Sequence, residues 1–189
     1  MMDLGPCQYY LGMRVTRDRV NRTIRLGQRA YAEKILRDYG MADCKPAATP
    51  MDTNLNLNPA ENGYEALSEI KLWYQGAVGA LMYLMLGTRP ELAFAISVVS
   101  RYSANPTDAH VSTIKRIFRY LKGILNYELI FRGSTSPLVG YTNIDWAGDK
   151  GTRRSTSGYT FNIGSGAISW SSKRQATVAL LTCEAEYVA

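Results

Sequence analysis

The chain has 189 residues, of which 46% are hydrophobic and 20% are charged, and its formal net charge is +6. This composition is typical of a globular protein and excludes an intrinsically disordered chain. The longest apolar run, Gly76 to Leu86, is shorter than the roughly 18 residues of a membrane span, which excludes a transmembrane protein. The three cysteines have no metal-binding spacing, and no signal peptide is visible, so we expect an intracellular protein.

Residues 1–41 are predicted to form a β-hairpin followed by a helix. Apolar and polar residues alternate over residues 9–15, a polar turn follows, and a second short run covers residues 23–26. From Gln28 the apolar spacing becomes helical, and Gly40 is a typical helix stop.

Residues 42–66 are predicted to be an extended linker. The segment contains Pro46, Pro50 and Pro59, is rich in asparagine, and has neither a helical nor a strand period. It is also net acidic, whereas the segments on both sides of it are net basic. This change in charge favours separate elements that the linker joins.

Residues 67–132 are predicted to form a bundle of three helices. The first helix is expected from Ser68 to Leu86, because its second half is apolar on almost every side. The second is expected to begin with a capping box in which Thr88 is paired with Glu91.

The third helix of this segment is predicted to begin at a cap formed by Thr107 or Asp108 and to end at Gly123. His110, the single histidine of the chain, is expected in the first turn on a solvent-facing surface, with no chemical role.

Basic residues gather on one face of this third helix. They are Lys115, Arg116, Arg119 and Lys122. Such a stripe can follow a phosphate backbone and bind nucleic acid. It can equally be an ordinary solvated face, and the spacing alone leaves both interpretations open.

Residues 133–189 are predicted to return to β structure. Strands are expected over residues 138–144, 158–163 and 167–171, and a final helix over residues 183–189. Residues 177–181 either add an edge strand or lead directly into that helix. If the sheet is incomplete, an apolar face is left uncovered and is available to a partner chain. That face is expected to contain Tyr159, Phe161, Ile168 and Trp170.

Several motifs resemble the Pol polyprotein of copia-type retrotransposons. Residues 140–149 (GYTNIDWAGD), 154–159 (RSTSGY), 167–175 (AISWSSKRQ) and 184–187 (EAEY) resemble the start of its ribonuclease H domain, in the family's order. The upstream motifs DLG and YLGM, together with GALMYL and TRPE, resemble the end of its reverse transcriptase and its thumb and connection region. The resemblance covers nearly the whole chain.

The resemblance implies an α+β fold in four parts. These are a palm-end hairpin and helix (1–41), the linker (42–66), the helical thumb and connection (67–132), and the N-terminal part of a ribonuclease H-like antiparallel sheet (133–189). Family polymerases use a Tyr-Val-Asp-Asp hairpin to hold Mg²⁺, and the chain contains no Asp-Asp pair. DNA synthesis by this chain is therefore not expected.

The resemblance also locates the ribonuclease H positions. Asn143 stands where the family has its first metal-bridging aspartate, Glu186 matches the helical glutamate, and Asp145 lies two residues beyond Asn143. An asparagine removes one negative charge from a site that holds two divalent cations, so Asp145 and Glu186 are expected to be vestigial ligands. We expect no cofactor unless ribonuclease H activity survives, in which case it is Mg²⁺.

Three functions stay open from the sequence. The first is an inactive Pol remnant that binds RNA–DNA hybrid or other nucleic acid weakly and without sequence preference. The second is a ribonuclease H completed by another chain, and the third is a non-catalytic interaction protein.

Overall fold

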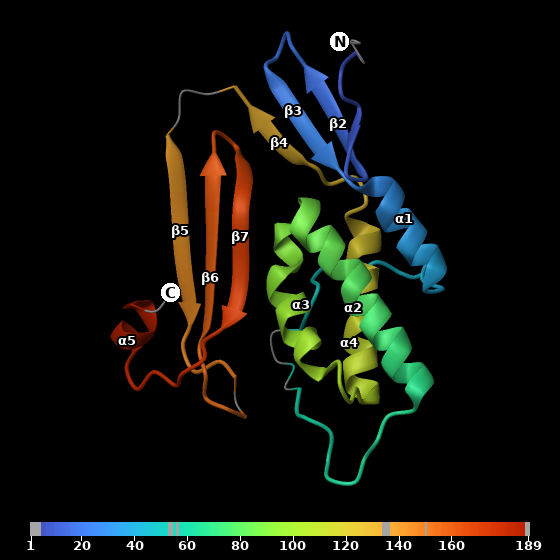
Figure 1. The fold of residues 1–189 in the computed structure, drawn as a ribbon, viewed down its shortest axis with the longest axis vertical. Coiled ribbons are helices and arrows are strands. Elements are labelled where there is room, and N and C mark those ends of the chain that lie inside the picture. The colour runs from blue at the N-terminus through green and yellow to red at the C-terminus, as the bar shows by residue number, and fades with distance from the viewer. Residues whose placement is uncertain (1–4, 53–54, 56, 134–136, 150, 188–189) are drawn as a thin grey trace.

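The computed structural model describes residues 5–52, 55, 57–133, 137–149 and 151–187. In these residues the fold is mixed α and β, with two antiparallel sheets and a helical bundle. Figure 1 shows the bundle below the first sheet and beside the second. The predicted α+β class is thus confirmed.

The first sheet is built from both ends of the helical region. Its strands, in spatial order, are β1 (Tyr9–Tyr10), β2 (Met13–Asp18), β3 (Thr23–Gly27) and β4 (Leu129–Arg132). The hairpin of β2 and β3 was predicted, but the single strand expected over residues 9–15 is wrong, because a turn at residues 11–12 divides it into β1 and β2, which pair antiparallel. Strand β4 was missed within a segment expected to be helical. Strand β4 pairs antiparallel with β3, so the polypeptide returns to its starting sheet after the bundle.

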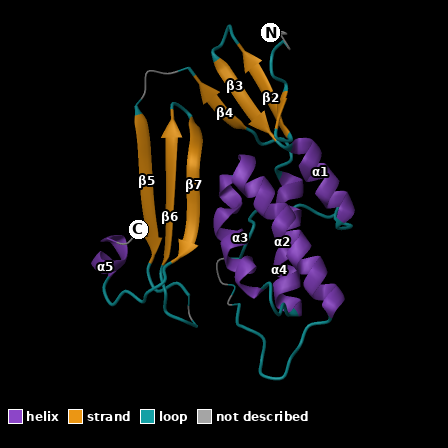
Figure 2. Ribbon diagram, viewed as in Figure 1, coloured by secondary structure: helices purple, strands orange, loops and turns teal. Residues whose placement is uncertain are grey.

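The bundle contains four α-helices, one more than the predicted three. They are α1 (Arg29–Asp38), α2 (Ser68–Thr88), α3 (Ala93–Val99) and α4 (Asp108–Gly123), with 3₁₀ turns at Pro90–Leu92 and Ser100–Tyr102. The added member is α1, whose buried residues Ile35 and Leu36 join the same core as Leu81, Ile96 and Phe118. Figure 2 shows these helices packed side by side.

The expected capping box at Thr88 is wrong. Thr88 is the buried last residue of α2, and its hydroxyl donates to the side-chain oxygen of Gln28 at 2.8 Å. A partner 60 positions away therefore replaces the local partner, Glu91. At α4, by contrast, the predicted cap Thr107 is confirmed, and the helix ends at Gly123 as expected.

His110 is buried and does not face solvent as predicted. Its ring has no exposed surface and stacks on Tyr102 with the ring centroids 3.9 Å apart. Its Nδ1 accepts the backbone N–H of Thr107 at 2.9 Å, which completes the capping box of α4. A histidine in the position usually held by Glu or Gln can cap because neutral imidazole offers one acceptor nitrogen.

The second sheet contains β5 (Leu138–Asp145), β6 (Thr156–Ile163) and β7 (Gly166–Arg174) in sequential antiparallel order. The short helix α5 (Thr182–Tyr187) follows, and the last two residues of the helix expected at 183–189 lie outside the described residues. Residues 177–181 contain no strand, which decides against the further edge strand.

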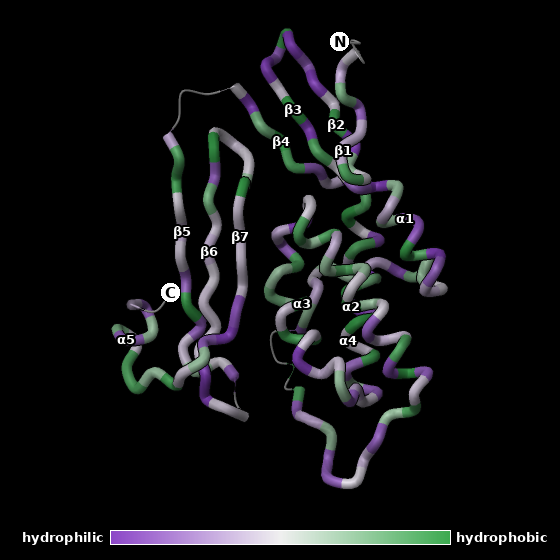
Figure 3. The backbone as a smooth tube through the Cα atoms, viewed as in Figure 1, coloured by the Kyte–Doolittle hydropathy of each residue, from purple (hydrophilic) through white to green (hydrophobic). Residues whose placement is uncertain are grey.

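The four residues expected on one apolar face of this sheet divide between its two faces. Tyr159 and Phe161 alternate with Thr160, and Thr160 pairs with Trp170, so Trp170 points to the opposite face from the other two aromatics. The indole N–H of Trp170 donates to the Met85 carbonyl of α2 at 3.0 Å. One face therefore packs against the bundle. Figure 3 shows short hydrophobic stretches along all three strands of this sheet.

Candidate functional site

Helix α4 carries the basic residues singled out from the sequence. Lys115 and Arg119 are exposed, whereas Arg116 and Lys122 are partly buried. The opposite side of the helix packs Ile114, Phe118 and Leu121 into the core. The helix is thus amphipathic as predicted, with an apolar face in the core and the basic residues at or near the surface.

Both arginines of this set bind the linker. The Nε of Arg119 donates to the Lys45 carbonyl at 2.8 Å, and the Nη2 of Arg116 donates to the Thr49 hydroxyl at 2.9 Å. Arg116 also lies 3.8 Å from the carboxylate of Asp52. The predicted phosphate stripe is thus partly occupied by the protein's own linker, a role that sequence spacing could not reveal.

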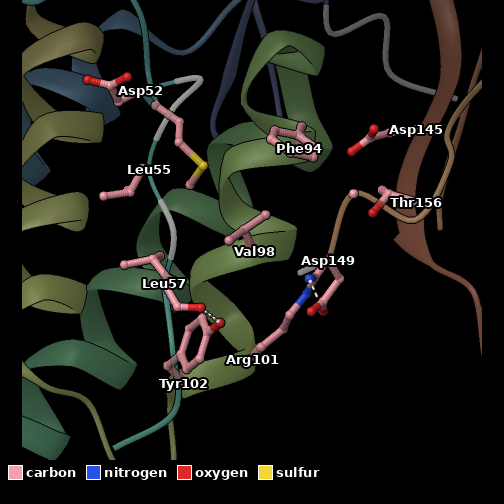
Figure 4. Close-up of a pocket in the computed structure, with 12 residues that line it drawn as sticks. Asp52, Leu55, Leu57, Phe94, Val98, Arg101, Tyr102, Asp145, Asp149 and Thr156 are labelled. Atoms are coloured by element: carbon pink, nitrogen blue, oxygen red, sulfur yellow. Dashed lines mark hydrogen bonds and ion pairs between the residues drawn. The ribbon is translucent and has the colours of Figure 1, made fainter. Parts of the chain in front are cut away.

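Asn143 and Asp145 lie together on β5. They pair with Gly158 and Thr156 of β6, so both project from the same face of the sheet, as strand alternation predicts. Both line a cavity of about 380 Å³ that also contains Phe94 of α3. An adjoining cavity shares Phe94, Asp145 and Thr156, and Figure 4 shows Asp145 opposite the ring of Phe94.

Glu186 does not line either cavity. The side-chain amide of Gln175 donates to the Ala185 carbonyl of α5 at 2.9 Å and to the Ser157 hydroxyl at 2.8 Å. Ser157 projects from the face opposite Asn143, and this bond attaches α5 there. Among the described residues, no group of three or more His, Cys, Asp or Glu could hold a metal ion, and the ligand roles stay predictions.

Asp149 was not selected from the sequence, yet it joins the second sheet to the bundle. One carboxylate oxygen contacts Arg101 at 3.2 Å and Arg174 of β7 at 2.5 Å, and the other accepts the backbone N–H of Thr152 at 3.1 Å. Burial raises the pKa of Asp149, but hydrogen bonds from Arg174 and Thr152 outweigh it and hold the pKa below its ordinary value. The carboxylate is thus charged and fixed at neutral pH.

A second connection joins the two sheets. The Ser165 hydroxyl, in the turn between β6 and β7, donates to the Ile130 carbonyl of β4 at 3.0 Å and accepts the Arg132 backbone N–H at 3.2 Å. Phe131 lies against Gly166, where a Cβ would approach its ring to 2.3 Å. This position admits only glycine without rearrangement.

Comparison with known proteins identifies the origin of the chain. It is 45% identical over 196 residues to the retrovirus-related Pol polyprotein from transposon TNT 1-94 of Nicotiana tabacum, and the match covers 100% of this chain and 14% of that protein. An uncharacterized mitochondrial protein of Arabidopsis thaliana is 40% identical over 99% of this chain and 75% of its own length. The chain belongs to the copia-type retrotransposon Pol family.

This Pol-family chain thus corresponds to a small part of the tobacco polyprotein. A secreted RxLR effector protein of Plasmopara viticola is also similar, with 51% identity over 61% of this chain and 82% of that protein. No family model and no solved structure matches the chain. Within the described residues, none of the helices is long and apolar enough to cross a membrane.

Proposed function

We propose that this Pol-derived chain is a non-catalytic protein that binds RNA–DNA hybrid or other nucleic acid without sequence preference. In this proposal the second sheet is the ribonuclease H-like part, and α4 with its neighbours is the thumb-like part. The observation that carries the proposal is the neutral Asn143 at the position of the family's first metal-bridging aspartate.

Loss of catalysis follows from the charge that Mg²⁺ requires. Two ions about 4 Å apart must be held by carboxylates that offset their mutual repulsion. The face of β5 that carries Asn143 offers the single carboxylate of Asp145, and α5 is attached from the other face. A neutral amide cannot replace the missing charge.

Binding is supported by the surface of α4. Lys115 and Arg119 are exposed, one turn apart, with Lys122 further along the helix. Cations at this spacing can contact successive phosphates, and such contacts carry no sequence information. Because Arg119 already donates one N–H group to the linker, we expect Lys115 to be more available for contact with a phosphate.

The test is binding of a fluorescently labelled RNA–DNA hybrid at 50 and 200 mM salt. We expect weak binding that falls with salt and is lost when Lys115→Glu and Arg119→Glu are combined. The matched control combines Lys34→Glu and Lys71→Glu, which change the net charge equally on α1 and α2. Equal losses in the two double variants would show that only net charge matters and would contradict a binding surface on α4.

A further inference from the structure

The cavity between α3 and the second sheet has aromatic side chains on two sides. Phe94 of α3 is 45% exposed, and Tyr141 of β5 is 61% exposed, although both line the same cavity. Aromatic rings left open to solvent on facing walls provide surfaces on which a planar group can stack.

The sheet side of this cavity carries Asn143 and Asp145 on one face of β5, and Glu91 with several serine and threonine residues also lines the cavity. Asn143 and Asp145 are exposed, and among the described residues no hydrogen bond is found to either side chain. The Asp145 carboxylate lies over Gly148, where a Cβ would come unacceptably close to it, so the glycine gives the carboxylate its room. A carboxylate and an amide about 6.6 Å apart along the strand thus face the cavity with open hydrogen-bonding capacity.

Contacts between the bundle and the second sheet hold the two walls of the cavity together. Asp149 joins Arg101, in the 3₁₀ turn after α3, to Arg174 of β7, and Trp170 donates to the Met85 carbonyl of α2. These contacts hold α2 and the end of the α3 segment against the sheet. The aromatic and polar groups are therefore arranged before any ligand enters, which lowers the entropic cost of binding.

We propose that this cavity binds a guanine base. The Watson–Crick edge of guanine presents two neighbouring N–H donors, at N1 and N2, and a carboxylate accepts such a pair with its two oxygens. The adjacent O6 acceptor suits the amide N–H of Asn143, and the ring stacks between Phe94 and Tyr141. Adenine lacks the paired donors and satisfies the Asp145 carboxylate less well.

The proposal is tested by calorimetric titration of the full chain with guanosine, inosine and adenosine 5′-monophosphates. Inosine has the same edge without the N2 amino group, so it isolates one of the two donors. We expect saturable binding that is strongest for guanosine monophosphate and weaker for the other two. Asp145→Asn is expected to reduce guanosine monophosphate affinity by about tenfold or more, the loss typical of a hydrogen bond to a charged group.

Two variants complete the test. Tyr141→Leu should weaken all three nucleotides, because it removes stacking and leaves the base edge untouched. Asp38→Asn, at an exposed ion pair on α1, should change none of them.

Equal affinity for guanosine and adenosine monophosphates would overturn the proposal, as would an Asp145→Asn variant with unchanged guanosine monophosphate affinity. Absence of saturable binding at millimolar nucleotide would overturn it as well. Circular dichroism of each variant checks that the fold is retained.

Discussion

At the scale of single residues, Asp149 connects the second sheet to the bundle. Its carboxylate is 15% exposed and meets Arg101 and Arg174, whose side chains are 18% and 28% exposed. Charged hydrogen bonds in such a partly buried place contribute more than exposed pairs, and loss of one partner leaves the others unpaired.

We expect Asp149→Asn to lower the free energy of unfolding by about 1–3 kcal/mol, because two arginines lose their counter-charge. Urea denaturation measures the change. The matched control is Asp38→Asn, which removes an exposed pair with Lys34 and should cost no more than about 0.5 kcal/mol. Equal costs in the two variants would show that Asp149 does not join the sheet to the bundle.

His110 gives the stability of the bundle a pH dependence. Burial lowers the pKa of its imidazole below the ordinary value near 6.5, and Nδ1 is already used as an acceptor from Thr107. The unfolded chain therefore binds a proton more readily than the folded chain below about pH 6.5. Stability is fully present above that pH and is lost as the pH falls.

Urea denaturation at pH 7 and pH 5 tests this effect. We expect the free energy of unfolding to fall by up to about 1.4 kcal/mol per pH unit below pH 6.5. His110→Gln keeps an acceptor for the cap and cannot gain the proton, so its own decrease should be clearly smaller. The same decrease in both proteins would assign the pH effect to other groups.

At the scale of elements, the linker is held by α4. The backbone carbonyl of Arg119 accepts the N–H of Ala47 at 3.2 Å while its side chain donates to Lys45. Arg116 adds the bond to Thr49. The described part of the linker thus has no helix or strand of its own and depends on these contacts.

Arg119→Ala is expected to raise the rate of proteolytic cleavage within residues 42–52 by about fivefold, which corresponds to the loss of one hydrogen bond of about 1 kcal/mol. Limited proteolysis followed by mass spectrometry measures the rate. Lys115→Ala serves as the control, since Lys115 lies on the same helix and has no hydrogen bond or ion pair to a linker residue that the structure describes. A fivefold increase in the control as well would contradict this role of Arg119.

Elements with local sequence signals were predicted, and those that depend on partners distant in the sequence were missed. Helix α4 was predicted within one residue because Thr107 and Gly123 are local signals. Strand β4 was missed because four residues carry little periodicity and its partner β3 lies about a hundred positions away. Thr88 was misread for the same reason, since Gln28 is distant in sequence.

The candidate site was predictable only where strand alternation decides it. Asn143 and Asp145 were expected on one face, and they share it. The position of α5 relative to that face, and the occupation of Arg116 and Arg119 by the linker, depend on tertiary packing. No local pattern in the sequence encodes these contacts.

At the scale of the whole molecule, the contacts between distant segments tie the parts together. Strand β4 returns from the bundle to pair with β3 in the first sheet, Ser165 joins the two sheets, and Trp170 binds α2 across 85 positions. The division into four parts stays a prediction from the family resemblance. The structure adds that the first and third parts share a sheet and a core.

The central claim is that a Pol-derived fold persists here without its metal-dependent chemistry. The most direct measurement is cleavage of a labelled RNA–DNA hybrid with Mg²⁺ or Mn²⁺ by this chain and by its Glu186→Gln variant. We expect no cleavage by either protein, because Asn143 leaves the site short of one carboxylate. Metal-dependent cleavage by the chain that disappears in Glu186→Gln would contradict the claim and show that the site is active.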